Sequence, residues 1–478
     1  MRKGLVNPSV YAGLYLASVF CVLTVLSFSV STLFDKALVI LTSISFCLCV
    51  RADWKAGRES LLKTWKRNFW GNRLLFLALG AYYLWNLVTL FYTRDFSLAL
   101  RGLPYRLEYL FLFLAGLYYC NSRKRLILLL GVIGLAGSVV SAASYLLYFF
   151  SRRPIYFQRT STARDYNVYA TLIFFSLVIA VTLILNFFQG SFWQRCLLLA
   201  GVLALNLPAF YLAGSRRMVI LLPYFAGFAL LYEGIRLALR KDWRRLAEQA
   251  VLLLCCGAAY FGVSLLAEPF AQFGAEKERA YQEWVSLQQS GQQSPGGNQA
   301  ESTVPEKTIS SILETIENGS MSSKRKLIYS TALRELLGYS PTEWVWGRGQ
   351  AYDLVLFDRT DDQALLEAYG YTTENRPSKG WMSAHNFLLA DVLGGGIIQL
   401  LLGLLVCFSA LAQTAAVCRK IPPLGLAVCI PAALCLCNSF ISGAFGLLNN
   451  VFFLVVLTIL CGGSVLFKSS GDAGEPHP

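Results

Sequence analysis

The sequence contains few charged residues and almost no histidine. Asp, Glu, Lys and Arg make up 15% of its 478 residues, and there are only two histidines. A soluble globular protein has about a quarter of its residues charged. Because 55% of the residues are hydrophobic, the composition excludes an ordinary soluble domain and predicts a polytopic membrane protein.

The spacing of the cysteines also does not indicate a metal site or a set of disulfide bonds. Most of its 13 cysteines lie inside apolar runs, where cysteine behaves as a small hydrophobic residue. None lies between Cys256 and Cys407, so the longest polar segment has no disulfide framework. No paired Cys-x-x-Cys spacing indicates zinc.

Positive charge exceeds negative charge by 14. Such an excess can indicate nucleic-acid binding, but in a membrane protein Lys and Arg concentrate in cytoplasmic loops, where they set orientation. We therefore expect the lipid bilayer as a partner and no nucleic acid.

Apolar runs long enough to cross a membrane recur along the chain. A spanning helix needs about 20 mostly apolar residues, and we predict an all-α protein with about twelve transmembrane helices. Nine spans fall within 1–267 and three within 385–467; 468–478 is a polar tail. The first run lacks a persuasive small-residue cleavage site, so we expect a retained helix. The candidate spans are 10–33, 35–50, 74–92, 103–120, 125–149, 166–188, 196–213, 217–239, 248–267, 386–413, 421–440 and 443–467.

The distribution of Lys and Arg predicts the orientation of these spans. Segments 51–73, 123–125 and 236–245 are rich in Lys and Arg and all become cytoplasmic if the amino terminus is cytoplasmic. Both termini then lie in the cytoplasm, and 268–384 forms a large loop on the outer face. Cations in two outer loops, 151–164 and 214–218, oppose this preference. An anionic ligand on the outer face would explain them.

The large loop shows two kinds of sequence. Residues 286–306 are rich in Gln, Ser, Gly and Pro, which predicts a disordered insert. The segments around it have helical spacing of apolar residues, and Gly319 and Gly338 suit helix ends. We therefore predict a small helical cap. No internal repeat is evident, which argues against a transporter built from inverted repeats.

His385 lies where this polar loop meets the next apolar run. Its position alone is explained equally well by an interfacial anchor or a helix cap. Arginines are predicted on the same side of the membrane, among them Arg325, Arg348, Arg216 and Arg217. Because guanidinium forms forked hydrogen bonds to phosphate oxygens, this set suits a phosphorylated lipid substrate. For each arginine taken singly, a cation at the lipid headgroup level is the alternative.

Three motifs occur in order: "AGSRRMVILL", "SSKRKLIYSTALRELLGYSPTEWVWGRG" and "SAHNFLLADVLGGGI". They resemble the O-antigen ligase and polymerase family of bacterial membrane glycosyltransferases, and "RTSTARDYNVYA" (159–170) is similar to an earlier helix entry of that family. The resemblance covers roughly residues 150–405. The chain departs from the pattern in having Arg217 directly after Arg216, Tyr329 where Trp is common, and Gly394-Gly395-Gly396 where an acidic residue is often found.

The resemblance implies a GT-C-like fold and a transferase in the bacterial plasma membrane. The donor would be a glycan on undecaprenyl diphosphate, and the acceptor a glycan, a lipid-linked glycan or a protein. His385 would act as general base, with Arg325 and Arg216 or Arg217 stabilising the departing diphosphate. No cofactor and no metal are expected. The segments predicted to lie outside the membrane contain no Asp-x-Asp motif. The candidate substrate-binding residues are Arg159, Arg164, Asn167, Arg348, Asn386 and Asp391.

Some of these assignments have alternatives. For Asn386 a helix cap is favoured, and for the Gly394–Gly396 run close helix packing. Asp391, an ionisable residue in a span, is a functional candidate that could pair with an arginine. A flippase or transporter of lipid-linked oligosaccharides, a protein O-oligosaccharyltransferase, and a cap-bearing receptor or scaffold are the alternative functions.

Overall fold

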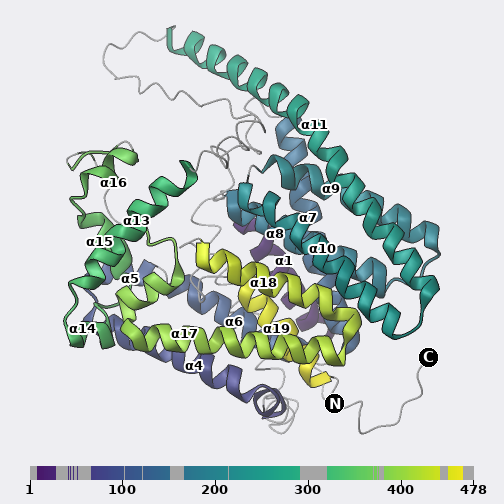
Figure 1. Ribbon diagram of the computed structural model, residues 1–478, viewed down its shortest axis with the longest axis horizontal. Coiled ribbons are helices and arrows are strands. Elements are labelled where there is room, and N and C mark those ends of the chain that lie inside the picture. Colours follow the sequence, from purple (N-terminus) through teal and green to yellow (C-terminus); the bar gives the residue numbers. More distant parts are fainter. Residues whose placement is uncertain are drawn as a thin grey trace, which may run out of the picture. The chain divides into compact units, whose positions relative to one another are not determined.

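A computed structural model shows an all-α protein (Figure 1). It describes residues 8–27, 66–101, 103–120, 122–150, 166–213, 215–290, 320–369, 371–373, 375, 382–441 and 451–466, together with 41, 44, 47 and 51. Within these ranges, seven helices are long and apolar enough to cross a membrane. By helix length and hydropathy the chain is a multi-pass membrane protein. The count of about twelve stays a prediction, and most of the candidate span 35–50 lies outside the described residues.

Contacts between residues divide the chain into two compact units, which we describe one at a time. The first unit comprises Met1–Val19, Leu33–Leu129 and Gly319–Pro478, and the second comprises Phe20–Thr32 and Leu130–Asn318. The predicted outer loop is shared between the units: its part up to Asn318 belongs to the second, and its part from Gly319 belongs to the first. The domain boundaries at residues 267 and 384 stay predictions.

In the first unit, the long helix α17 (Phe387–Lys420) is central. It packs against α4 (Arg73–Val88), α18 (Gly425–Ile441) and α19 (Val451–Leu466). The helix α6 (Leu103–Tyr119) packs on α19. Short elements complete these spans: η1 (Thr89–Tyr92) and α5 (Phe96–Arg101) follow α4, and η2 (Pro422–Leu424) joins α17 to α18. The first helix, α1 (Pro8–Ser27), is divided between the two units.

The predicted helical cap belongs to this unit. Figure 1 shows α13 (Ser320–Leu337), α14 (Pro341–Trp346), α15 (Tyr352–Arg359) and α16 (Gln363–Ala368) gathered beside the first turns of α17. Ile328, Phe357 and Leu393 belong to one buried cluster, so cap and span share a core. The helix end predicted at Gly338 is confirmed, since α13 stops at Leu337.

Local signals in the cap sequence set the helix starts. Ser340 and Glu343 form a capping box at α14. Asp362 caps α16 and also accepts a hydrogen bond from the Thr331 hydroxyl at 3.0 Å. The Asp362 carboxylate therefore binds the backbone of one helix and the side chain of another.

The second unit contains α8 (Tyr166–Asn186), α9 (Phe192–Leu212), α10 (Arg216–Leu239), α11 (Trp243–Ser290) and most of α7 (Arg123–Phe150). The helix α11 packs against α9 and α10. Its 48 residues form one helix across the boundary predicted at 267, with Pro269 inside it. The predicted insert 286–306 is therefore helical over its first residues, up to Ser290, and the rest of it lies outside the described residues.

Two features explain why α11 continues. Its second half is rich in Glu, Lys, Ala and Gln, which are good helix formers. The Lys277 ammonium also donates hydrogen bonds of 2.7 Å to the carbonyl oxygens of Tyr148 and Phe149, at the end of α7. A cation at these carbonyls satisfies a helix terminus, so α7 anchors the part of α11 that leaves the predicted span.

Candidate functional site

His385 has a left-handed backbone conformation, with φ of 50°. It is partly buried and lies between the fully buried Ala384 and the start of α17. Left-handed backbone is uncommon for residues other than glycine, although histidine adopts it more readily than most. Such conformations persist where the surrounding structure fixes them, so the neighbours of His385 are informative.

Asn386, the residue after His385, is held by hydrogen bonds to the start of α17. Its side-chain oxygen accepts hydrogen bonds from the backbone N–H groups of Leu388 at 2.8 Å and Leu389 at 3.4 Å. Asn386 is thus the N-cap of α17, and the interpretation favoured from the sequence is confirmed. A contact of this side chain with substrate stays a prediction.

Arg325 lies in the first half of α13 and is partly buried. Burial raises the pKa of Tyr369, and the nearby charge of Arg325 partly offsets this rise. Ile328, one turn after Arg325, and Ala384, directly before His385, belong to the same buried cluster. The fold therefore packs the two segments that carry Arg325 and His385 against a common core.

Arg348 is occupied inside the cap. Its guanidinium forms ion pairs with Glu335 and, at 2.7 Å, with Glu343, and lies 4.3 Å from the ring centroid of Tyr339. The hydrogen bond from Arg348 lowers the pKa of Glu343 to about 2, helped by the backbone N–H of Ser340. These contacts favour a structural role over the predicted contact with substrate, which remains untested.

The glycines on either side of Arg348 contact the three-glycine run of α17. The backbone N–H of Arg348 donates to the Leu393 carbonyl at 3.0 Å, and that of Gly349 to the Gly394 carbonyl at 2.8 Å. α17 is interrupted at Gly396, which has φ of 67° and ψ of −166°. The sequence predicted that this run serves close helix packing. The close approach is real, but a turn of the cap makes it.

The end of α4 and η1 contact the same turn of the cap. The indole N–H of Trp85 donates to the Gly395 carbonyl at 2.9 Å, and the Tyr92 hydroxyl donates to the Trp346 carbonyl at 2.6 Å. The rings of Trp85 and Trp346 lie 5.1 Å apart. We call the turn Trp346–Gln350 the docking turn, because it joins the cap to both α4 and α17.

Asp391 is buried, with 6% of its surface exposed, one turn after the N-cap of α17. Its carboxylate accepts hydrogen bonds from the Tyr82 hydroxyl at 2.8 and 2.9 Å and from the Gln399 amide at 2.8 Å. Arg106 is close enough to interact electrostatically. The predicted pairing of Asp391 with an arginine of the site stays a prediction, because Arg106 was not among the predicted site residues.

Sequence reasoning missed three of these residues: Tyr82, Arg106 and Asp353. Asp353 lies in the first turn of α15. Burial raises the pKa of its carboxyl from 3.8 to about 6, while hydrogen bonds from the backbone of Ala384 and Leu354 and the charge of Arg106 oppose the rise. An acidic residue that begins an amphipathic helix is a common pattern, so no local signal distinguished Asp353.

The other predicted site residues belong to the second unit or lie outside the description. Arg216 and Arg217 open α10, and Asn167 lies in the first turn of α8, but their side chains are outside the described set. Arg159 and Arg164 lie entirely outside it. Within the described residues of the first unit, the structure brings together the segments of His385, Arg325, Arg348, Asn386 and Asp391.

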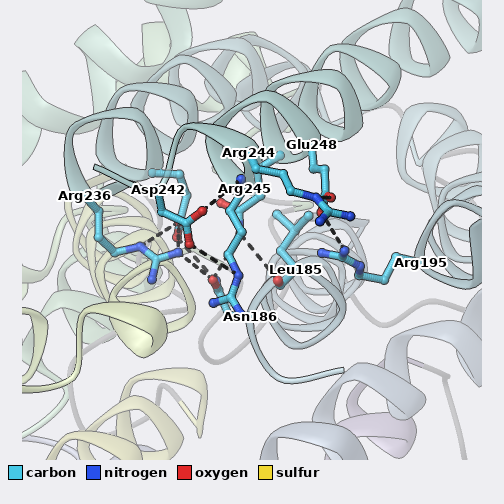
Figure 2. Close-up of polar contacts among 10 residues, drawn as sticks. Leu185, Asn186, Arg195, Arg236, Asp242, Arg244, Arg245 and Glu248 are labelled. Carbon is cyan, nitrogen blue, oxygen red and sulfur yellow. Dashed lines mark hydrogen bonds and ion pairs between the residues drawn. The ribbon is translucent and has the colours of Figure 1, made fainter. Parts of the chain in front are cut away.

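The second unit has a polar network of its own where α8, α9, α10 and α11 end or begin (Figure 2). Arg236 pairs with Glu233 and donates to the Asn186 side-chain oxygen at 2.7 Å. Arg195 pairs with Glu248 at 2.7 Å. These cations are used to hold helix ends together. Among the described residues of the whole chain, no group of three or more His, Cys, Asp or Glu side chains could hold a metal ion.

Comparison with known proteins adds no relative. No family model matches the chain, and no curated protein is similar to it in sequence.

Proposed function

We propose that the protein is a membrane glycosyltransferase that moves a glycan from undecaprenyl diphosphate to an acceptor hydroxyl at the outer face of the bacterial plasma membrane. The observation that carries the proposal is the left-handed His385, held between the cap and the N-cap of α17. A strained, partly exposed titratable residue at the junction of a cap and a span has the character of a catalytic group.

In this reaction His385 takes the proton of the acceptor hydroxyl. The acceptor oxygen then forms a bond to the anomeric carbon of the donor sugar. The bond from that carbon to the diphosphate oxygen breaks, and its electron pair leaves with undecaprenyl diphosphate. Histidine suits the first step because its ordinary pKa, about 6.5, lies near neutral pH.

Cations stabilise the negative charge that develops on the leaving diphosphate. Arg325 supplies one, since its segment packs against the same core as that of His385. Arg216 or Arg217 supplies another, and Arg159, Arg164 and Asn167 are further donor-binding candidates carried by the resemblance. The reaction requires no cofactor, because the donor already has a good leaving group.

The test is glycan transfer by the full-length protein in proteoliposomes that contain lipid-linked glycan and envelope acceptors from the native host. His385→Ala is paired with His477→Ala, and Arg325→Ala with Lys326→Ala, the exposed cation beside it. We expect loss of transfer in His385→Ala and at least a tenfold decrease in Arg325→Ala, with both controls active. Full transfer by His385→Ala, with normal folding, would reject the proposal.

The acceptor separates the variants of this activity. Glycan recovered on protein would indicate a protein O-oligosaccharyltransferase, and glycan recovered on a glycolipid or a growing polysaccharide would indicate a ligase or a polymerase. Protease treatment of the product, followed by gel analysis, distinguishes these outcomes.

A specific observation favours a flippase of lipid-linked oligosaccharides as the second candidate. α17 is interrupted at Gly396, shortly after the buried Asp391, and broken helices beside ionisable residues occur at transport sites. A flippase would move a fluorescent lipid-linked oligosaccharide across a vesicle bilayer without an acceptor, and this movement would not depend on His385. A transferase would not move the lipid across the bilayer, and its glycan transfer would require both an acceptor and His385.

A further inference from the structure

Two cysteines meet where α17 is followed by α18. The Sγ atoms of Cys418 and Cys429 lie 2.9 Å apart, and both residues are free thiols. Unbonded carbon atoms in contact lie about 3.5–4.0 Å apart, and sulfur is larger than carbon. A disulfide bond is about 2.05 Å long, so a shift of less than about 1 Å would join the two sulfurs.

The sequence between the two cysteines causes this meeting. Pro422 and Pro423 cannot continue α17, because proline lacks a backbone N–H and clashes with the preceding turn. The chain forms the short element η2 and starts α18 at Gly425. The helices α17 and α18 thus form a helical hairpin and pack side by side (Figure 1). Cys418 lies in the last turn of α17, and Cys429 lies in the second turn of α18.

The packing of the hairpin keeps the two thiols facing each other. Val417 and Val428, each directly before one of the cysteines, are buried. The Cys418 Sγ also lies 4.0 Å from the carbonyl oxygen of Gly425, four residues before Cys429. Residues four apart lie on one face of a helix. One face of α18 therefore presents both Gly425 and Cys429 to Cys418.

Both thiols can be reached by a small reagent. Cys418 and Cys429 are partly exposed, whereas Cys407 and Cys435, on the same two helices, are buried. In the orientation predicted from Lys and Arg, this end of α17 faces the cytoplasm, where thiols are kept reduced. The pair would then rest as two thiols and change state when an oxidant reaches it.

We propose that Cys418 and Cys429 are a redox-active pair that a peroxide converts into an intramolecular disulfide across the α17–α18 hairpin. The thiolate of one cysteine attacks a peroxide oxygen and the O–O bond breaks. Hydroxide leaves and takes up the proton that the thiol released, which gives water and a sulfenic acid. The second thiol attacks the sulfenic sulfur, the S–S bond forms, the S–O bond breaks, and a second water leaves. This chemistry does not depend on glycan transfer.

Peptide mapping of the full-length protein in detergent tests for this disulfide. The protein is treated with hydrogen peroxide, its remaining thiols are blocked with N-ethylmaleimide, and it is digested with trypsin. Trypsin cuts after Arg419 and Lys420, between the two cysteines, so a disulfide between them keeps two otherwise separate peptides together. Mass spectrometry with and without dithiothreitol identifies these peptides. A non-reducing gel of undigested protein shows whether the link lies within a single chain.

Three variants assign the link to the pair. Cys418→Ser and Cys429→Ser each remove one sulfur. Cys437→Ser is the matched control, because Cys437 lies about two turns after Cys429 in α18 and is also partly exposed. If a serine variant does not fold, alanine at the same position takes its place, because free cysteine packs as a small hydrophobic residue.

We expect linked peptides in wild type and in Cys437→Ser, their separation by dithiothreitol, and their loss in both Cys418→Ser and Cys429→Ser. Recovery of Cys418 and Cys429 from peroxide-treated wild type as thiols or as sulfinic acids, without a link, would overturn the pairing. Linked peptides that persist in Cys418→Ser would assign the disulfide to other cysteines and would overturn it as well.

Discussion

Tyr82 and Tyr83 are neighbours in α4 with opposite hydrogen-bonding states. The Tyr82 hydroxyl donates to the buried carboxylate of Asp391. The Tyr83 hydroxyl is buried and has no hydrogen-bond partner among the described residues. The Tyr82 hydroxyl therefore donates to a buried carboxylate at the start of α17, and the Tyr83 hydroxyl makes no hydrogen bond to the described residues.

Removing these two hydroxyls should have different effects. We expect Tyr82→Phe to lower the free energy of unfolding by about 1–3 kcal/mol, because Asp391 loses a donor. Tyr83→Phe should be neutral or slightly stabilising. Thermal unfolding in a single detergent measures both. Equal destabilisation by the two substitutions would contradict the hydrogen bond to Asp391.

Arg348 and Glu343 predict a dependence of cap stability on acid. The pKa of Glu343 is lowered from 4.5 to about 2 in the folded protein, chiefly by the hydrogen bond from Arg348. A carboxyl with a depressed folded pKa stabilises the fold above its unfolded pKa. That contribution should be present above about pH 4.5 and decline toward pH 2.

The measurement compares wild type with Arg348→Met over this pH range. The difference in unfolding temperature should be largest near neutral pH and shrink as the pH falls, because acid protonates the carboxylates that Arg348 binds. Arg334→Met, at a cation whose side chain is 72% exposed, should show a much smaller difference at every pH. A difference for Arg348→Met that does not vary with pH would argue against the pairing.

At the scale of elements, backbone hydrogen bonds join the docking turn to α17, from Arg348 to Leu393 and from Gly349 to Gly394. Gly347 and Gly396 both have positive φ with ψ near 180°, at 72° and 67°, a region that only glycine enters readily. A Cβ on either residue would also overlap backbone atoms of the opposite segment. The cap therefore reaches the spans at a point where no side chain fits.

Gly347→Ala should consequently separate the docking turn from α17. We expect a loss of several kcal/mol of stability, since backbone strain of about 1–3 kcal/mol adds to the steric overlap. Gly80→Ala, in α4 with nothing within 4 Å of the added methyl, should be neutral or stabilising. Limited proteolysis of the cap, together with thermal unfolding, tests this. A stable, protease-resistant Gly347→Ala protein would refute the contact.

Helix ends that depend on residues within one helical turn could be predicted from the sequence. Contacts between segments far apart in the sequence could not. The end of α13 at Gly338 and the cap of α17 at Asn386 follow from residue types within one helical turn. The hydrogen bond of Tyr82 with Asp391 joins residues 309 positions apart, and neither carries a local sign of the other.

The same distinction explains the candidate site. His385 and Arg325 stood out because histidine is scarce and because arginine suits phosphate. Asp353 did not stand out, since the burial that raises the pKa of its carboxyl arises only in the folded chain. The continuation of α11 was also missed, because its anchor on α7 is a Lys277 contact over more than 120 residues.

At the scale of the whole molecule, helix ends meet within each unit as alternating spans require. In the first unit, the end of α4, the start of α6 and the start of α17 lie on the side of the cap. In the second, the ends of α8 and α10 meet the starts of α9 and α11 (Figure 2). The orientation of these helix ends relative to the cytoplasm stays the prediction made from Lys and Arg.

This orientation makes a labelling prediction. In a background without cysteine, Asp361→Cys in the cap should react with a membrane-impermeant maleimide added outside intact cells. Arg244→Cys, at the exposed start of α11, should react only after the membrane is permeabilised. Outside labelling of both cysteines, or of Arg244→Cys alone, would contradict the predicted orientation.

The backbone contact of Gly347 with Gly394 and Gly396 also bears on how this sequence can diverge. If one of these glycines gained a side chain, no substitution at the other positions could make room for it. The new side chain would overlap backbone atoms, which cannot be made smaller by mutation. Drift can therefore alter most of the apolar surface of the spans while these glycines stay fixed together. Chains that share the fold should be recognisable by a glycine before the cap arginine and a glycine run after the histidine, even where little else in them can be aligned.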